Sequence, residues 1–315
     1  FKNNASFWRV IEMAQSFQSH YLCCMIKICG FTFIRNAIQY DFPISEAILS
    51  ILPICDKVYV AVGQSEDGTR EVIEKLSPKI VIIDTIWDDS HRAGGRVLAE
   101  ETDKAFKAIP YEFDWCIYIQ GDEVIHEKYL EVIKSNIEIN NDNENVDGLL
   151  LHYLHFYGNY QYVADSSRWY RKEIRVIRND KSIYSYRDAQ GFRVGKDKML
   201  KVKLIPAFVY HYGYVKHPAT MKAKINNSQR YWHSDDWLNE NAIKEELFDY
   251  GNIESLTLFK DSHPAVMKER IQARDWDFNF DIQVKKRKPK KKIKYYIEKW
   301  TGWRIGEYKN YILLK

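Results

Sequence analysis

The chain has 315 residues, of which 45% are hydrophobic and 29% are charged, and its formal net charge at pH 7 is +4. That length allows one large domain, or one domain with an appendage, and the composition is ordinary for a soluble enzyme. The charge is uneven, because residues 284–315 carry a balance of +10 and the remaining residues carry −6. A mildly acidic body excludes a nucleic-acid-binding protein, whose basic residues would cover one face of the fold.

Residues 1–24 lack the order of a signal peptide and are expected to form an N-terminal extension. After them, short apolar runs alternate with helix-like segments. We expect strands over 25–33, 57–62, 79–84 and 115–120, and helices over 43–52, 69–76, 95–109 and 127–139. This alternation predicts an α/β fold, with a mainly parallel sheet that helices cover on both faces. Ligands of such sheets bind beyond the carboxyl ends of the strands.

The second half of the chain has a weaker pattern. A polar run at 140–145 is the expected break after the first half. Further strands are expected over 148–157 and 173–178, short strands and loops over 181–215, and mostly helix over 219–275.

The last segment, residues 284–315, is basic and amphipathic, with Trp300 and Trp303 after a lysine run. It fits either a solvated charged segment or a contact with an anionic membrane surface, and we favour the membrane contact. Five cysteines form no Cys-x-x-Cys pair, which indicates buried free thiols in a reducing compartment. We therefore expect a cytoplasmic protein, peripheral on the inner face of the membrane.

Two adjacent carboxylates, Asp122 and Glu123, follow the expected strand over 115–120 at its carboxyl end. Oxygen ligands suit Mg²⁺ or Mn²⁺, which proteins usually bind through one or two carboxylates together with substrate phosphates. The alternative is a Gly-Asp turn that only ends the strand. The position after the fourth strand favours a metal site. Strand alternation would turn Glu123 away from Asp122, which leaves Glu123 a supporting role.

The segment Asp114-Trp115-Cys116-Ile117-Tyr118-Ile119-Gln120-Gly121-Asp122-Glu123 resembles the D-W-x-x-x-x-D-A-D-E motif of family 2 glycosyltransferases, which are inverting, nucleotide-sugar-dependent enzymes of the GT-A fold. Three upstream pieces resemble the same family in order. They are Phe33-Ile34-Arg35-Asn36, the loop Ser65-Glu66-Asp67-Gly68-Thr69, and Asp84 with Trp87 beyond it.

The resemblance implies a GT-A-type, Rossmann-like mixed sheet over residues 25–218, with a nucleotide-sugar half over 25–140 and an acceptor half over 141–218. A helical region over 219–283 would follow. The residues implied to bind the donor are Phe33, Arg35, Asn36, Asp67, Asp84, Arg96, Gln120 and Gly121. The residues implied to bind Mg²⁺ or Mn²⁺ are Asp122, Glu123 and His211, although His211 equally fits a diphosphate contact or a structural role.

The chain departs from the family pattern at three points. Gln120 stands where the motif has its first Asp, and Val62 stands where many members have an Asp that recognises the base. An Arg-Asn pair of the third helix is missing, so Arg92 or Arg96 would serve the diphosphate instead. Gly94-Gly95 fits either a phosphate contact at a helix start or a simple turn.

The implied reaction is inverting, and it requires a carboxylate base to assist the acceptor hydroxyl. We choose Asp188, in a mixed polar and aromatic loop, with Asp165 and Glu173 as rivals. The expected function is transfer of a sugar from a nucleotide-diphosphate donor to a glycan or lipid-linked acceptor, in cell-surface polysaccharide or lipopolysaccharide synthesis. A sugar-phosphate nucleotidyltransferase and a non-catalytic nucleotide- or glycan-binding protein are the alternatives.

Overall fold

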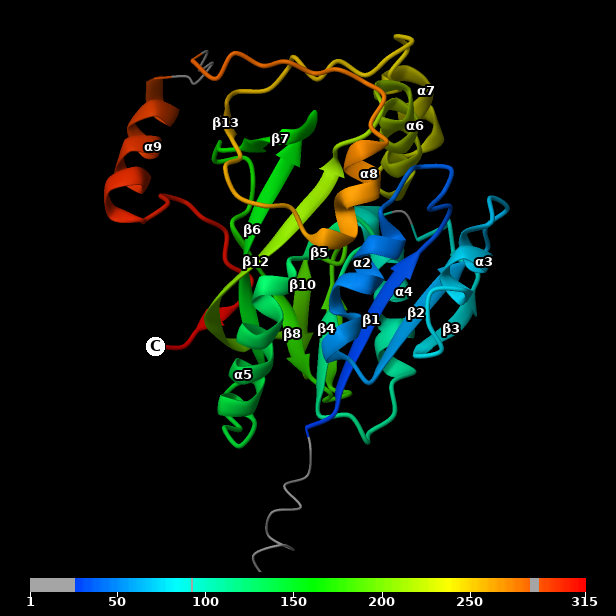
Figure 1. The fold of residues 1–315 in the computed structure, drawn as a ribbon, viewed down its shortest axis with the longest axis vertical. Coiled ribbons are helices and arrows are strands. Elements are labelled where there is room, and N and C mark those ends of the chain that lie inside the picture. The colour runs from blue at the N-terminus through cyan, green and yellow to red at the C-terminus, as the bar shows by residue number, and fades with distance from the viewer. Residues whose placement is uncertain (1–25, 92, 284–288) are drawn as a thin grey trace, which may run out of the picture.

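A computed structural model describes residues 26–91, 93–283 and 289–315. Its centre is an eleven-stranded sheet, whose main path runs β13-β7-β6-β8-β4-β1-β2-β3 (Figure 1). The expected α/β fold is confirmed. The expected extension 1–24, with Cys23 and Cys24, and Arg92 lie outside the described residues.

The first half of the chain forms the parallel part of the sheet. Its elements are β1 (Ile28–Ile34), α2 (Ile44–Ile51), β2 (Lys57–Gly63), α3 (Thr69–Glu74), β3 (Ile80–Thr85), α4 (Arg96–Lys107), β4 (Trp115–Tyr118) and α5 (Leu130–Asn140). Strand β1 pairs in parallel with both β2 and β4, and β2 pairs in parallel with β3. The four expected strands and four expected helices of this half are therefore present, within a few residues of their expected bounds.

The second half is largely antiparallel, so the sheet is mixed as a whole and mainly parallel only in the first half. Its elements are β5 (Glu123–Ile125), β6 (Gly148–Tyr157), β7 (Asn159–Ala164), β8 (Lys172–Arg178), β12 (Lys201–Tyr214), β13 (Leu256–Leu258) and β14 (Ile312–Leu313), with a small separate sheet of β9 (Ile183–Tyr186), β10 (Gly191–Val194) and β11 (Lys198–Met199). Strand β8 runs antiparallel to both β4 and β6, and it joins the two halves.

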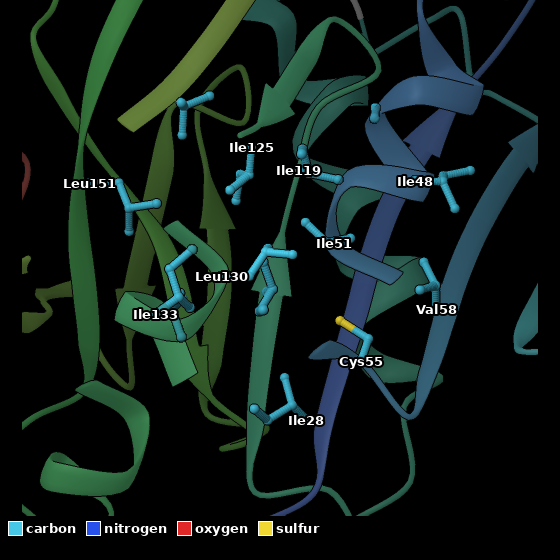
Figure 2. Close-up of a cluster of buried hydrophobic side chains, with 14 of the residues drawn as sticks. Ile28, Ile48, Ile51, Cys55, Val58, Ile119, Ile125, Leu130, Ile133 and Leu151 are labelled. Carbon is cyan, nitrogen blue, oxygen red and sulfur yellow. The ribbon is translucent and has the colours of Figure 1, made fainter. Parts of the chain in front are cut away.

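The core on one face of the sheet is aliphatic. Figure 2 shows side chains of this cluster from β1, α2, β2, β5, α5 and β6, among them Ile48, Val58, Ile125 and Leu151. Helix α2 approaches β1 closely because Gly30 has no side chain; a Cβ there would lie 2.7 Å from Cδ1 of Ile51. This packing fixes β1, and with it the carboxyl end of the sheet.

The region 219–275 is less helical than its sequence predicts. It contains α6 (Pro218–Ser228), α7 (Asp235–Asn241) and α8 (Lys268–Gln272), but much of it is irregular, and β13 joins the sheet beside β7. None of the helices within the described ranges is long and apolar enough to cross a membrane.

The basic C-terminal segment is part of the fold. Helix α9 (Pro289–Thr301) lies at the periphery (Figure 1), and the chain then returns to the sheet, where β14 pairs in parallel with β12. The Tyr311 side chain is buried, and the Arg193 guanidinium donates a 2.8 Å hydrogen bond to the Asn310 carbonyl. Residues beyond α9 therefore complete the second half of the molecule.

Candidate functional site

Asp122 lies in the turn between β4 and β5, at the carboxyl end of β4. The preceding Gly121 lets this turn pack against β1, since a Cβ there would lie 2.7 Å from Cδ1 of Ile34. The Lys224 ammonium, from α6, donates a 3.0 Å hydrogen bond to Oδ2 of Asp122, and Nε2 of His211 lies 3.7 Å from Oδ1. Burial alone would raise the pKa of Asp122, but the Lys224 ammonium beside it holds that pKa well below its usual range. The carboxylate is therefore charged at neutral pH.

His211 has an orientation that a second histidine fixes. Strands β6 and β12 pair so that His211 lies opposite His155, and their Nδ1 atoms are 3.2 Å apart. Nε2 of His155 lies 2.8 Å from the Tyr170 carbonyl, which can only accept a hydrogen bond. His155 thus donates through Nε2 and accepts at Nδ1, so Nδ1 of His211 is the donor between the two rings. Burial lowers the pKa of both histidines, in agreement with two neutral rings.

This hydrogen-bond order leaves a lone pair on Nε2 of His211, facing a charged carboxylate oxygen of Asp122. Two acceptors so close favour a cation between them. Gly213 keeps the space open, because a Cβ at this position would lie 2.7 Å from both Oδ2 of Asp122 and Nε2 of His211. The Asp122 carboxylate suits Mg²⁺ or Mn²⁺, and the His211 imidazole, a nitrogen ligand, favours the transition metal Mn²⁺ over Mg²⁺, so the residues fit Mn²⁺ best.

The protein can supply only part of a metal's coordination shell. Within the part of the chain that the structure describes, no group of three or more His, Cys, Asp or Glu side chains is placed to hold an ion. Asp122 and His211 would thus be two ligands, with substrate phosphate oxygens and water completing the shell.

The Glu123 side chain is engaged elsewhere. Its two carboxylate oxygens each accept a 2.8 Å hydrogen bond from the Arg175 guanidinium, and the Tyr153 hydroxyl donates to it at 2.7 Å. Both partners of the ion pair are buried. Metal binding by Glu123, as expected from the sequence, would require this pair to break. The expected opposite orientation of Asp122 and Glu123 explains how adjacent carboxylates have different partners.

Gln120 connects this strand end to the loop of Asp188. Its amide nitrogen donates 3.3 Å hydrogen bonds to the Tyr118 hydroxyl and to the Ala189 carbonyl. A carboxylate could not donate either bond, which gives a physical reason for glutamine at this position. Gln120 therefore connects the strand end before Asp122 to the loop that contains Asp188.

Asp188 is held in a strained loop. The residues on either side of it, Arg187 and Ala189, have φ of 55° and 61°, which non-glycine residues rarely adopt. Cβ of Asp188 lies so close to Gly95 that a Cβ on this glycine would be 2.6 Å away. The buried Oδ1 of Asp188 has no hydrogen-bond partner among the described residues, and burial raises the pKa of the carboxyl. These are features of a base that is free to accept a proton.

The two rival bases differ from Asp188 in their surroundings. Glu173 lines the same cavity as Gln120 and Asp188, and burial raises the pKa of its carboxyl to about 8. Asp165 does not line that cavity, and it accepts a hydrogen bond from the Ser255 hydroxyl. Glu173 would be largely protonated at neutral pH, which makes it a poorer base than Asp188.

A second cavity, of about 250 Å³, opens beyond the carboxyl end of β1. Arg35 and Asn36 line it, with Arg230 and Tyr231 from the segment after α6. The rings of Phe33 and Trp87 are 5.9 Å apart, and the Arg35 guanidinium lies 5.6 Å from the Trp87 ring centroid. Phe33, Arg35 and Asn36, which the sequence predicts to bind the donor, thus lie close together beside aromatic and cationic side chains.

Other expected donor residues have local partners. Asp67 accepts hydrogen bonds from the Gln39 and Thr69 amides, and Asp84 accepts a 2.8 Å hydrogen bond from Arg70. Arg96 is exposed and pairs with Glu100 at 3.3 Å, and lines a further cavity beside Asp188. Donor contacts by these three residues remain predictions.

The sequence reasoning missed four residues of the site: His155, Arg175, Gly213 and Lys224. Each one acts through a neighbour that is far away in sequence. His155 could be found only from the β6–β12 register, and Lys224 only from the contact of α6 with the turn after β4. No local motif marks either residue.

Neither the known protein-family models nor the curated proteins include a match to this chain. Some solved structures are similar over part of it. TarS 1–349 of S. aureus in complex with UDP has 14% identity and a TM-score of 0.38, over 70% of this chain and 68% of that one. A 4-diphosphocytidyl-2C-methyl-D-erythritol synthase from Anaerococcus prevotii has 12% identity and a TM-score of 0.35, over 65% and 96%.

A glucosyl-3-phosphoglycerate synthase from Mycobacterium tuberculosis, in complex with Mn²⁺ and UDP-glucose, has 14% identity and a TM-score of 0.29, over 42% of this chain and 44% of that one. These likenesses are too weak to carry an activity from one protein to another. The function is therefore inferred from the residues of the site.

We predict that Arg175→Leu lowers the free energy of unfolding by about 3–5 kcal/mol, because it leaves the buried Glu123 carboxylate without its cation. Urea unfolding followed by circular dichroism measures this change. Arg96→Leu is the matched control, since the Arg96 side chain is 72% exposed, and it should change stability by less than about 0.5 kcal/mol. Equal effects of the two substitutions would show that the buried Glu123 carboxylate does not depend on the Arg175 cation.

Proposed function

We propose that this chain is a metal-assisted glycosyltransferase that moves a sugar from a nucleotide-diphosphate donor to a glycan or lipid-linked acceptor. The observation that carries the proposal is the pair of acceptors on Asp122 and His211, which face each other at the carboxyl end of β4 across the space that Gly213 leaves open. A candidate base, Asp188, is connected to the same strand end through Gln120.

The donor would lie along the carboxyl ends of β1 and β4. Its nucleoside would occupy the cavity beside Phe33, Arg35 and Asn36, and its diphosphate would reach Asp122 and Lys224. A divalent cation on Asp122 and His211 would act as a Lewis acid, neutralising the charge that develops on the departing diphosphate. Lys224 adds positive charge beside Asp122, and the buried Lys216, whose pKa burial lowers to about 7, adds part of a charge near neutral pH.

In the proposed reaction, Asp188 acts as the base. The acceptor hydroxyl oxygen attacks the anomeric carbon as the bond from that carbon to the diphosphate oxygen breaks, and the configuration inverts. The hydroxyl proton passes to the Asp188 carboxylate, and the nucleoside diphosphate leaves with the bonding electrons. Tyr118 and Gln120 hold the Asp188 loop through the Ala189 carbonyl, so the base stays beside the donor site.

The C-terminal helix supports the finer proposal of a membrane-surface acceptor. Large side chains of Ile293, Tyr296 and Trp300 recur along α9 at helical spacing and are exposed, Trp300 to 83%. Lys292, Lys294 and Lys299 lie among them on the same helix. Aromatic side chains and lysines on one exposed helix fit the interface of an anionic bilayer. The enzyme would then act on the cytoplasmic surface, in synthesis of a cell-surface polysaccharide or lipopolysaccharide.

We predict that Asp122→Ala weakens Mn²⁺-dependent binding of nucleoside diphosphates by more than about 100-fold, since it removes one of the two protein ligands. Calorimetry with UDP, GDP, TDP and ADP, each with Mn²⁺ and with EDTA, measures the loss of affinity and also identifies the preferred nucleotide base. Asp142→Ala, at an exposed position after α5, is the control. Unchanged Mn²⁺-dependent binding in Asp122→Ala would remove the site assignment, and hence the proposal.

We predict that Asp188→Asn lowers kcat by about 10²–10⁴-fold and leaves nucleotide binding unchanged. In the native enzyme, kcat/KM should fall as the pH drops through the raised pKa of Asp188, because protonation removes the base. The acid limb should thus begin above the pH expected from an ordinary Asp.

Glu173→Gln provides the matched test of the rival base. It should lower kcat by less than about tenfold, because Gln resembles the protonated Glu173 carboxyl, whose pKa is about 8. An acid limb near pH 8 that disappears in Glu173→Gln would transfer the role of base from Asp188 to Glu173.

We predict that the double substitution Tyr296→Ala and Trp300→Ala reduces binding to phosphatidylserine vesicles at least about tenfold, because it removes the apolar part of the contact. Vesicle co-sedimentation of the full chain measures binding, with pure phosphatidylcholine vesicles as the uncharged comparison. Tyr111→Ala, at a site 81% exposed on another part of the surface, is the control. Equal binding by the native chain and the double variant would exclude α9 as the contact.

A further inference from the structure

A cavity of about 430 Å³ lies beside Gln120 and Asp188, away from the nucleoside cavity. One wall is β8 and the loop before it, from Ser167 to Arg175, and the other is the C-terminal segment from Arg304 to Tyr311. An ion pair of 2.8 Å between Arg171 and Glu307 connects the two walls. The cavity is therefore built by the fold, and the last residues of the chain are part of it.

Half of the cations in this cavity are already neutralised. Arg171 pairs with Glu307 and Glu298, Arg304 pairs with Glu298 at 2.7 Å, and Arg175 pairs with the buried Glu123. These contacts use Glu307 of the C-terminal wall, Glu298 of α9 and Glu123 of β5.

Three further cations have no carboxylate within ion-pair distance among the described residues. They are Arg168, Lys172 and Lys294. Lys172 is half-buried. Burial lowers the pKa of its ammonium group, and the attraction of Glu307 offsets this only in part because Arg171 and Lys309 act in the opposite direction. Glu173, next to it, has a pKa raised to about 8 and contributes little negative charge near neutral pH.

We propose that this cavity is the acceptor subsite and that it binds a sugar or polyol carrying an anionic group, a phosphate or a carboxylate. The inference rests on the proposed function, because it places the reacting hydroxyl at Asp188. The anionic group lies on Lys172, with Arg168 and Lys294 at the rim. Trp169 and Tyr170 line the cavity and offer faces on which a sugar ring packs.

The test compares binding of three probes to the full chain: glucose 6-phosphate, glucuronate and glucose. Ligand-observed NMR titration measures the affinities in low salt. At least one anionic probe should bind about tenfold more tightly than glucose, the usual effect of a hydrogen bond to a charged group. The better of the two anions identifies the group. Equal affinities of all three probes would overturn the proposal.

Lys172→Met keeps the aliphatic stem and removes the charge. It should weaken binding of the preferred anion about tenfold and leave glucose unchanged. Lys75→Met, at an exposed position after α3 on the far edge of the sheet, should change neither affinity. Anion binding that is unaffected by Lys172→Met, or weakened equally by Lys75→Met, would overturn the proposal.

Measuring Mn²⁺-dependent binding of a nucleoside diphosphate to the Lys172→Met variant distinguishes the acceptor proposal from the proposed glycosyl transfer. Normal nucleotide binding shows that the variant is folded and that a lost anion affinity belongs to the cavity. If the native chain selects the anionic probes but binds no nucleoside diphosphate, the cavity is an anion site and the proposed glycosyl transfer fails. If it binds the nucleotide but not the anions, only the acceptor proposal fails.

Discussion

The ion pair between Glu123 and Arg175 is the contact on which the geometry of the site depends. It connects β5 with β8, and the Tyr153 hydroxyl from β6 adds a third strand. The guanidinium also lies 5.0 Å from the Tyr118 ring centroid and 5.2 Å from that of Tyr153. Two charges with almost no exposure are costly to desolvate, so the pair contributes less to stability than to geometry. It holds β5, β6 and β8 together beside the turn that follows the carboxyl end of β4.

Adjacent carboxylates with opposite roles follow from this contact. The Glu123 carboxylate also accepts a 3.1 Å hydrogen bond from the backbone N–H of Gln120, and this bond closes the turn around Asp122. Asp122 then faces β12, where His211 and Gly213 lie two residues apart and on the same side of the strand. The buried Glu123–Arg175 pair thus positions Asp122 in the site. The pair itself would not contact the metal ion that Asp122 would bind.

The sequence predicts the parallel half well, because its signals are local. Apolar runs such as Lys57–Gly63 and the helices between them are visible from periodicity alone, and Asp122 follows from its place after the fourth strand. The partners of these residues come from pairings across the sheet. The Glu123–Arg175 pair, the His155–His211 contact and the return of Tyr311 to the fold each join segments more than 50 residues apart. Local patterns hold no information about such pairings.

Gln120 shows how a departure from a family motif can be read physically. An aspartate there would place a further negative charge beside Asp122 and Asp188, and it would face the Ala189 carbonyl without a proton to donate. The amide instead donates to this carbonyl, and so holds the loop in which Arg187 and Ala189 are strained. Because Asp188 has a raised pKa and an unpartnered oxygen, fewer negative neighbours also favour its ionised form. Glutamine at this position therefore connects the turn that we propose to bind the metal to the loop of the proposed base, and it weakens the interpretation of this chain as a glycosyltransferase that has lost its activity.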